Sequence, residues 1–129
     1  MNAAVILAVA AGGALGSVAR YLMSTVLRST APGFPWGTLL VNVVGGLAMG
    51  LITAYALTRP GALSDTVRIG LTTGILGGFT TFSAFSIETL LLWREGSAAA
   101  AFTNIAANLL LSLAACALGF WLARISTTA

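Results

Sequence analysis

Long uncharged stretches alternate with short charged or turn-rich connections along the chain. Each stretch reaches the roughly 18–20 residues that a helix needs to cross the hydrocarbon core of a bilayer. The stretches are residues 1–19, 29–58, 69–87 and 96–123. The connections contain charged residues together with proline and glycine, which break helices. The pattern predicts a single all-α domain, residues 1–129, with transmembrane helices at 3–27, 37–57, 67–92 and 98–125.

The composition excludes a water-soluble protein. Hydrophobic residues make up 58% of the chain and charged residues 7%, whereas soluble domains contain about 45–50% and 25%. The net charge of +3 is spread over few residues, so we expect a lipid bilayer and no nucleic acid as partner. There is no histidine and only one cysteine, which leaves no internal disulfide and no common metal-ligand set. These features indicate a protein that is not an enzyme.

The arginines are divided equally between the two sides of the predicted membrane domain. With the N-terminus in the cytoplasm, the inner side holds Arg59, Arg68 and Arg124, and the outer side holds Arg20, Arg28 and Arg94. Positive charge normally marks the cytoplasmic side, and this distribution gives no preference. Either another signal decides the orientation, or copies insert in both directions and pair antiparallel.

Glycines recur four residues apart in the predicted helices, a spacing that allows helix backbones to approach closely in lipid. The pairs are Gly12 and Gly16, Gly46 and Gly50, Gly70 and Gly74, and Gly74 and Gly78. Close packing both within and between subunits would favour an oligomer. The alternative is that each pair only packs helices inside one subunit.

The third predicted helix has an unfavourable segment near its middle. Residues 74–81 contain three glycines within five positions, followed by two threonines, which is a poor helical sequence. The segment lies about halfway between Arg68 and Glu88, near the bilayer centre for a rise of about 1.5 Å per residue. A break there must be satisfied by protein, ion or water, and broken helices commonly bind ions. A continuous helix with a glycine-rich packing face is the alternative.

Aromatic side chains follow this segment. Phe79, Phe82 and Phe85 recur at a spacing of three, so in a helix they would share one face. The edge of a phenyl ring carries positive partial charge. Rings turned edge-on can therefore solvate an anion without binding it tightly.

Polar side chains lie inside three predicted helices. Asn104, Asn108 and Ser112 follow one face of the fourth helix, and Asn42 and Arg20 lie in the second and first. One such stripe could simply hold helices together through hydrogen bonds between them. Three stripes predict a water-filled or ion-lined path. Arg20 would attract anions at its mouth, or else snorkel to the interface. Glu88, the only acid near a span, could pair with an arginine, couple to protons or lie among headgroups.

Three motifs resemble the CrcB/Fluc family of fluoride channels. They are GGALGSVARY at residues 12–21, GTLLVNVVG at 37–45 and GILGGFTTFSAF at 74–85. The resemblance implies an antiparallel, dual-topology homodimer with two pores and one structural Na⁺ at its centre. The implied Na⁺ ligands are the backbone carbonyls of Gly77 and Thr80. The implied fluoride-path residues are Phe82, Phe85, Asn42, Ser83 and Ser112, with Arg20 in the vestibule and Glu88 as a possible regulatory or pore-side acid.

The chain departs from the family pattern at two places. Ala84 stands where the third motif usually has a small hydroxyl residue, which removes one donor. Asn104 and Asn108 stand where relatives commonly have an aromatic or small hydroxyl residue. The fourth helix therefore keeps a line of polar residues, but the residue types at two of its positions differ from those common in the family.

The resemblance implies passive export of fluoride across the cytoplasmic (inner) membrane of a prokaryote, which relieves fluoride toxicity. A small multidrug-type exporter is one alternative, but it needs an acid in the first helix, where this chain has Arg20 as its one charged residue. A non-transporting membrane scaffold subunit is another. That alternative leaves the intramembrane asparagines unexplained.

Overall fold

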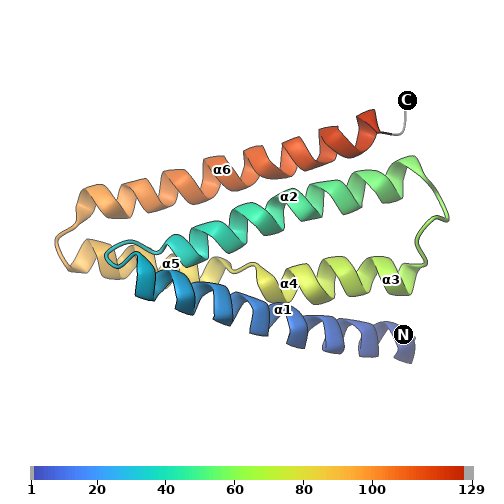
Figure 1. The fold of residues 1–129 in the computed structure, drawn as a ribbon, viewed down its shortest axis with the longest axis horizontal. Coiled ribbons are helices and arrows are strands. Elements are labelled where there is room, and N and C mark those ends of the chain that lie inside the picture. Colours follow the sequence, from blue (N-terminus) through green and yellow to red (C-terminus); the bar gives the residue numbers. More distant parts are fainter. Residues whose placement is uncertain (1, 127–129) are drawn as a thin grey trace.

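The computed structural model describes residues 2–126, which form helices joined by short turns, with no strand in that part of the chain (Figure 1). Its elements are α1 (Ala3–Thr30), α2 (Trp36–Thr58), α3 (Asp65–Ile69), η1 (Gly70–Leu76), α4 (Gly77–Phe79), α5 (Phe82–Arg94) and α6 (Ala98–Ile125). Four helical spans among these residues are long and apolar enough to cross a membrane, because α3 to α5 together form the third. The predicted helix bounds are close to those observed; the largest difference is the end of the first helix, predicted at residue 27 and observed at Thr30.

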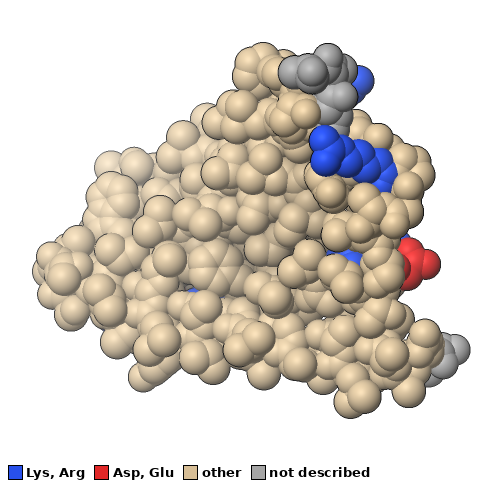
Figure 2. Space-filling model, turned by 45° about the vertical axis from the view of Figure 1, so that its right-hand side comes forward, with Lys and Arg blue, Asp and Glu red and all other residues tan. Residues whose placement is uncertain are grey.

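The four spans lie side by side, with both termini at one end and the turns at residues 31–35 and 95–97 at the other (Figure 1). Charged side chains are sparse, and those in view gather mostly at the end that carries the termini (Figure 2). Leu7, Leu110 and Leu113 on the sides of the helices are 67–68% exposed. This apolar belt is the surface expected of a multi-pass membrane protein.

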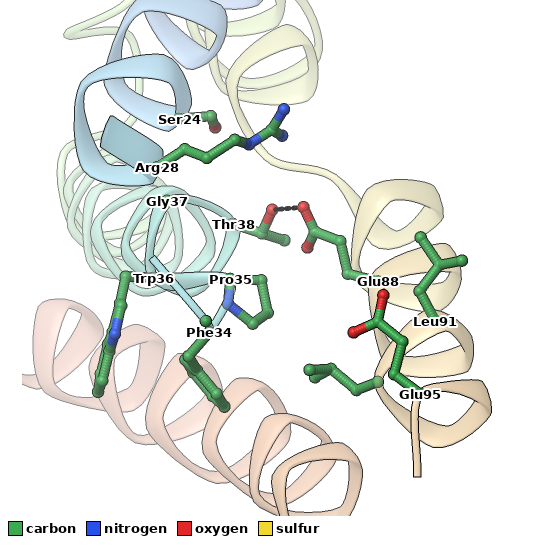
Figure 3. A pocket seen from close by; sticks show the side chains of 12 residues that line it. Ser24, Arg28, Phe34, Pro35, Trp36, Gly37, Thr38, Glu88, Leu91 and Glu95 are labelled. Atoms are coloured by element: carbon green, nitrogen blue, oxygen red, sulfur yellow. Dashed lines mark hydrogen bonds between the residues drawn. The ribbon is translucent and has the colours of Figure 1, made fainter. Parts of the chain in front are cut away.

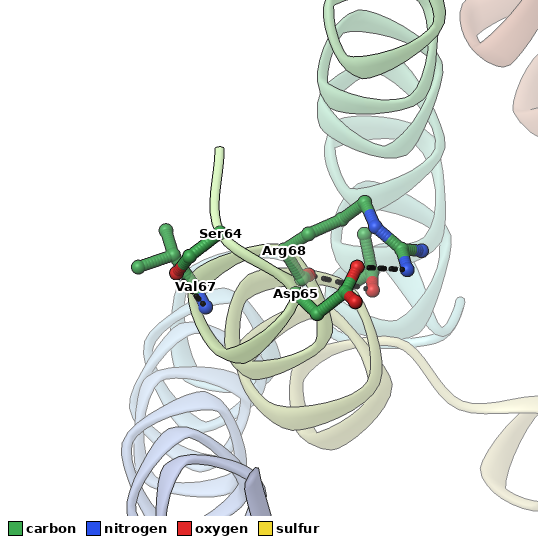
Figure 4. Close-up of polar contacts among 5 residues, drawn as sticks. Ser64, Asp65, Val67 and Arg68 are labelled. Carbon is green, nitrogen blue, oxygen red and sulfur yellow. Dashed lines mark hydrogen bonds and ion pairs between the residues drawn. The ribbon is translucent and has the colours of Figure 1, made fainter. Parts of the chain in front are cut away.

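Polar residues fix the start of the third span at the charged end of the molecule (Figure 4). The Ser64 hydroxyl accepts a hydrogen bond from the Val67 amide at 3.3 Å, which caps α3. Asp65 pairs with Arg68 at 3.0 Å, and the Thr72 hydroxyl donates to the Arg68 carbonyl at 2.9 Å. These contacts set where the chain re-enters the apolar layer.

The glycine pairs bring helices together inside the protomer. A Cβ at Gly12 would lie 2.7 Å from the Gly70 carbonyl oxygen, and one at Gly16 would lie 2.8 Å from the Phe79 nitrogen. A Cβ at Gly46 would lie 2.8 Å from the Ser112 carbonyl oxygen, so α2 and α6 touch through their backbones. These contacts lie within one chain, so the glycine pairs serve helix packing inside the subunit.

The third span is interrupted after its glycines rather than at them. Gly70–Leu76 is a π-helix, and Gly77–Phe79 continues it as an α-helical turn. Thr80 (φ −79°, ψ 158°) and Thr81 (φ −155°, ψ 120°) are extended, and α5 then begins at Phe82. The glycines stay helical because they lie against α1; a Cβ at Gly74 would lie 3.2 Å from the Ala8 carbonyl oxygen.

Candidate functional site

The two threonines of the interruption cap the helices on either side of it. The Thr80 amide and hydroxyl both donate to the Leu76 carbonyl, each at 2.9 Å, which closes the end of α4. The Thr81 hydroxyl accepts from the Ala84 amide at 3.1 Å, which caps the start of α5. A threonine N-cap before an apolar run is a sequence signal that could have located the interruption.

Asn42 on α2 pairs with the extended backbone at Thr81. The Thr81 amide donates to Asn42 Oδ1 at 2.8 Å, and Asn42 Nδ2 donates back to the Thr81 carbonyl at 3.1 Å. The side-chain amide therefore replaces the helical partners that this residue lacks. Backbone groups left unpaired in an apolar layer are costly, so Asn42 stabilises the interruption directly.

Arg20 on α1 also contacts the interruption. Its Nη1 donates to the Thr80 carbonyl at 3.3 Å, and the side chain is partly buried. The guanidinium lies where carbonyls of the preceding helical half are left without intrahelical partners, the end that favours positive charge. The sequence predicts this side chain at the mouth of an ion path, and the structure places it against the helix break.

A groove of about 350 Å³ opens beside the interruption, between α2, α5 and α6. Phe82 is 72% exposed and Phe85 is 8% exposed, with ring centroids 5.2 Å apart and planes inclined by 57°. The predicted residues that line the groove are Asn42, Thr80, Phe82, Phe85, Asn108 and Ser112. The structure therefore brings together side chains from the second, third and fourth spans. Arg20 of the first span, which the polar stripes also included, does not line this groove.

Two hydroxyl groups near the groove differ in their partners. The Ser112 hydroxyl oxygen is buried and has no hydrogen-bond partner within residues 2–126. Ser83 is exposed, and its hydroxyl lies 3.3 Å from the Thr81 hydroxyl. Ser112 is thus the groove residue that has an unused donor.

Phe79 does not share a face with Phe82 and Phe85. It ends α4, before the interruption, and it is buried with its ring near Gly45. The extended residues between α4 and α5 destroy the helical register that the spacing of three assumed. Only Phe82 and Phe85 form the aromatic wall of the groove.

Asn104 and Glu88 lie outside the groove. Asn104 is fully buried, and its Nδ2 donates to the Thr89 hydroxyl at 2.8 Å. Glu88 borders a separate cavity of about 380 Å³, where its Oε1 accepts from the Thr38 hydroxyl at 2.8 Å and Arg28 lies across from it (Figure 3). Glu88 Oε2 has no hydrogen-bond partner within residues 2–126.

The backbone carbonyl oxygens of Gly77 and Thr80 are of the kind that can act as ligands of a monovalent cation. Carbonyls at an interrupted helix coordinate Na⁺ in membrane proteins, and Gly77 is exposed on the protomer. The Thr80 carbonyl has a second lone pair beside the one that Arg20 uses. Among the described residues no group of three His, Cys, Asp or Glu side chains could hold a metal. The carbonyls are therefore the groups here that fit a cation.

Four apolar spans, one of them interrupted beside a groove with polar and aromatic walls, define a multi-pass membrane protein. The sequence matches the family described as CrcB-like protein, Camphor Resistance (CrcB), over residues 7–120. The chain belongs to this family.

Curated relatives match over nearly the whole chain. It is 49% identical over 120 residues to the fluoride-specific ion channel FluC of Caulobacter vibrioides (strain NA1000 / CB15N), covering 92% of this chain and 94% of that protein. It is 49% identical over 117 residues to the fluoride-specific ion channel FluC of Geobacter sulfurreducens, covering 90% of each. Because these relatives are named as ion channels, the prediction that the chain is not an enzyme is confirmed.

Proposed function

We propose that this protein is a fluoride-selective channel that exports F⁻ passively across the cytoplasmic membrane. The observation that carries the proposal is the groove in which Asn42, Phe82 and Phe85 meet beside the helix break. The relatives named as fluoride-specific channels supply the identity of the ion. Fluoride enters cells as neutral HF, dissociates and is trapped. A negative interior then drives F⁻ outward with about 2.3 kcal/mol per 100 mV.

In this proposal the groove replaces part of the hydration shell of the ion. The edges of the Phe82 and Phe85 rings offer weak positive partial charge, and the Ser112 hydroxyl offers a donor that has no protein partner among the described residues. Weak contacts of this kind allow a small anion to leave as readily as it enters. A narrow path excludes the larger chloride ion.

The protein acts as an antiparallel homodimer with two pores. Irregular backbone does not occur on the lipid-facing surface of a membrane protein, because its polar groups would lack hydrogen-bond partners. Gly77, Phe82 and Ser83 around the interruption are nevertheless exposed on the protomer. The near-equal arginine distribution favours insertion in both directions, and two oppositely inserted copies can pair. A second copy would then cover the exposed backbone at the interruption. The Gly77 and Thr80 carbonyls of two copies would hold one Na⁺, which supplies fixed positive charge at the mid-membrane interface.

Fluoride efflux from proteoliposomes, measured with a fluoride electrode, tests the proposal. We expect wild-type protein to release fluoride without a proton gradient and to release no chloride under the same conditions. Phe82→Ile removes an aromatic wall of the groove and should abolish fluoride efflux. The control is Phe102→Ile, because Phe102 is 62% exposed on α6 outside the groove. Efflux that requires a pH gradient would indicate an exporter instead, and no efflux at all would indicate a scaffold.

A further inference from the structure

The polar side chains of α2, α5 and α6 form one continuous, partly buried chain of hydrogen bonds. It starts at the Thr81 amide and passes through Asn42, whose Nδ2 donates to Asn108 Oδ1 at 2.9 Å. Asn108 Nδ2 donates to Asn104 Oδ1 at 2.9 Å, and Asn104 Nδ2 donates to the Thr89 hydroxyl at 2.8 Å. The Thr89 hydroxyl donates to the Phe85 carbonyl at 2.7 Å. The chain therefore links the helix break to α5 two turns further along.

The direction of every amide in this chain is determined. If the Asn42 amide were flipped, its oxygen would face the Thr81 carbonyl and its nitrogen the Thr81 amide, so both contacts would be lost. Asn108 is fixed in the same way, because its Nδ2 also donates to the Asn104 backbone carbonyl at 3.1 Å. Hydrogen bonds aligned head to tail in an apolar interior polarise and strengthen one another. These hydrogen bonds therefore act as one cooperative unit rather than as five independent contacts.

Neither asparagine of α6 offers a free donor to an ion in the groove. Both hydrogens of the Asn108 Nδ2 point to Asn104, and Asn104 is fully buried and does not line the groove. Asn42 likewise directs its two hydrogens at Thr81 and Asn108. A fluoride ion in the groove could accept hydrogen bonds from these amides only if it broke the series of hydrogen bonds that joins them.

We infer that Asn104 and Asn108 are positioning residues, which hold the Asn42 amide on the Thr81 backbone and so set the shape of the groove at the break. The inference rests on the proposed channel function and says how the polar track of α6 serves it. It also explains why this chain can have asparagines at two positions where the resemblance implied an aromatic or small hydroxyl residue. They replace contacts with the ion by contacts with one another.

Thr89 provides the sharpest test because it ends the chain and does not line the groove. Thr89→Val removes the acceptor of Asn104, whereas Thr89→Ser retains it. Thr58→Val is a matched control, because the Thr58 hydroxyl also donates to the carbonyl four residues earlier, at 2.8 Å, but belongs to no such chain. Each variant is reconstituted at less than one channel per vesicle. The rate of fluoride efflux then reports each channel, and the active fraction reports the amount folded.

We expect Thr89→Val to slow the rate per channel about tenfold, since it leaves a buried amide donor without its partner, at an unchanged active fraction. Thr89→Ser and Thr58→Val should keep the wild-type rate. Asn104→Leu should slow the rate as Thr89→Val does. A normal rate in Thr89→Val would overturn the inference, even if Asn104→Leu were slow, because Asn104 would then contact the ion itself. A loss of active fraction alone would also overturn it. Wild-type protein that passes no fluoride would instead remove the proposed function.

Discussion

Polar residues inside a membrane protein can serve an ion or the protein's own backbone. Around the helix break, Asn42, Thr81 and Arg20 all bond to backbone atoms of residues 80–84. A buried backbone group without a partner costs about 1–3 kcal/mol, so these contacts stabilise the extended segment at Thr80 and Thr81. The side chains that contact the break therefore have a structural role, which is to satisfy its backbone hydrogen-bonding groups.

Arg20 is the residue at which these two roles can be separated. Arg20→Met removes a charged donor from the partly buried Thr80 carbonyl, and we expect the free energy of unfolding in detergent to fall by about 1–2 kcal/mol. Arg94→Met is the control, because Arg94 is exposed in the last turn of α5. An arginine that mainly attracts anions would leave the unfolding midpoint unchanged. Its removal would instead slow fluoride efflux most strongly at low ionic strength.

At the scale of the helices, the interruption depends on capping as much as on glycine. The Thr81 side chain caps α5 through the Ala84 amide at 3.1 Å. Thr81→Val should lower thermal stability by about 0.5–2 kcal/mol, the usual loss for an N-cap, and Thr81→Ser should restore most of it. Thr103→Val changes an exposed threonine of α6 and serves as the control. Equal unfolding midpoints for Thr81→Val and wild type would show that the cap does not hold the break.

The helices could be predicted from the sequence because their length and apolarity are local properties. The end of α2 at Thr58 coincides with the end of an uncharged stretch, and its start at Trp36 follows the turn that contains Pro32, Gly33 and Pro35. The position of the interruption could not be predicted in this way. Gly74 and Gly78 are poor helix formers in isolation, but contact with α1 keeps them helical. The hydrogen bonds from Asn42 through Asn108 to Thr89 depend on which faces of three helices pack together. The periodicity of residues along the sequence does not say which faces those are.

At the scale of the whole molecule, the structure refines the charge balance on which dual topology depends. Both termini lie at one end (Figure 1). The same end carries Arg59 after α2, Arg68 in α3 and Arg124 in the last turn of α6. Arg28 and Arg94 lie near the opposite turns, whereas Arg20 is bonded to the helix break. The loops thus carry three arginines against two. Such a small difference leaves insertion in both directions possible, because orientation follows the excess of positive charge in short loops.

Adding charge at one end tests this balance. Ala31→Arg and Ser97→Arg, combined with Arg59→Ala and Arg68→Ala, give the end with two arginines four against one. That end should become uniformly cytoplasmic. Ala31→Arg with Ala62→Arg adds one charge to each end and serves as the matched control. Reporters fused to the C-terminus should detect both orientations in wild type and control, but one in the biased variant. If pores need antiparallel partners, the biased variant alone should export no fluoride. Co-expression with an oppositely biased variant, Ala62→Arg with Arg94→Ala, should restore export. Full export by the biased variant alone would mean that parallel copies conduct, which the antiparallel arrangement forbids.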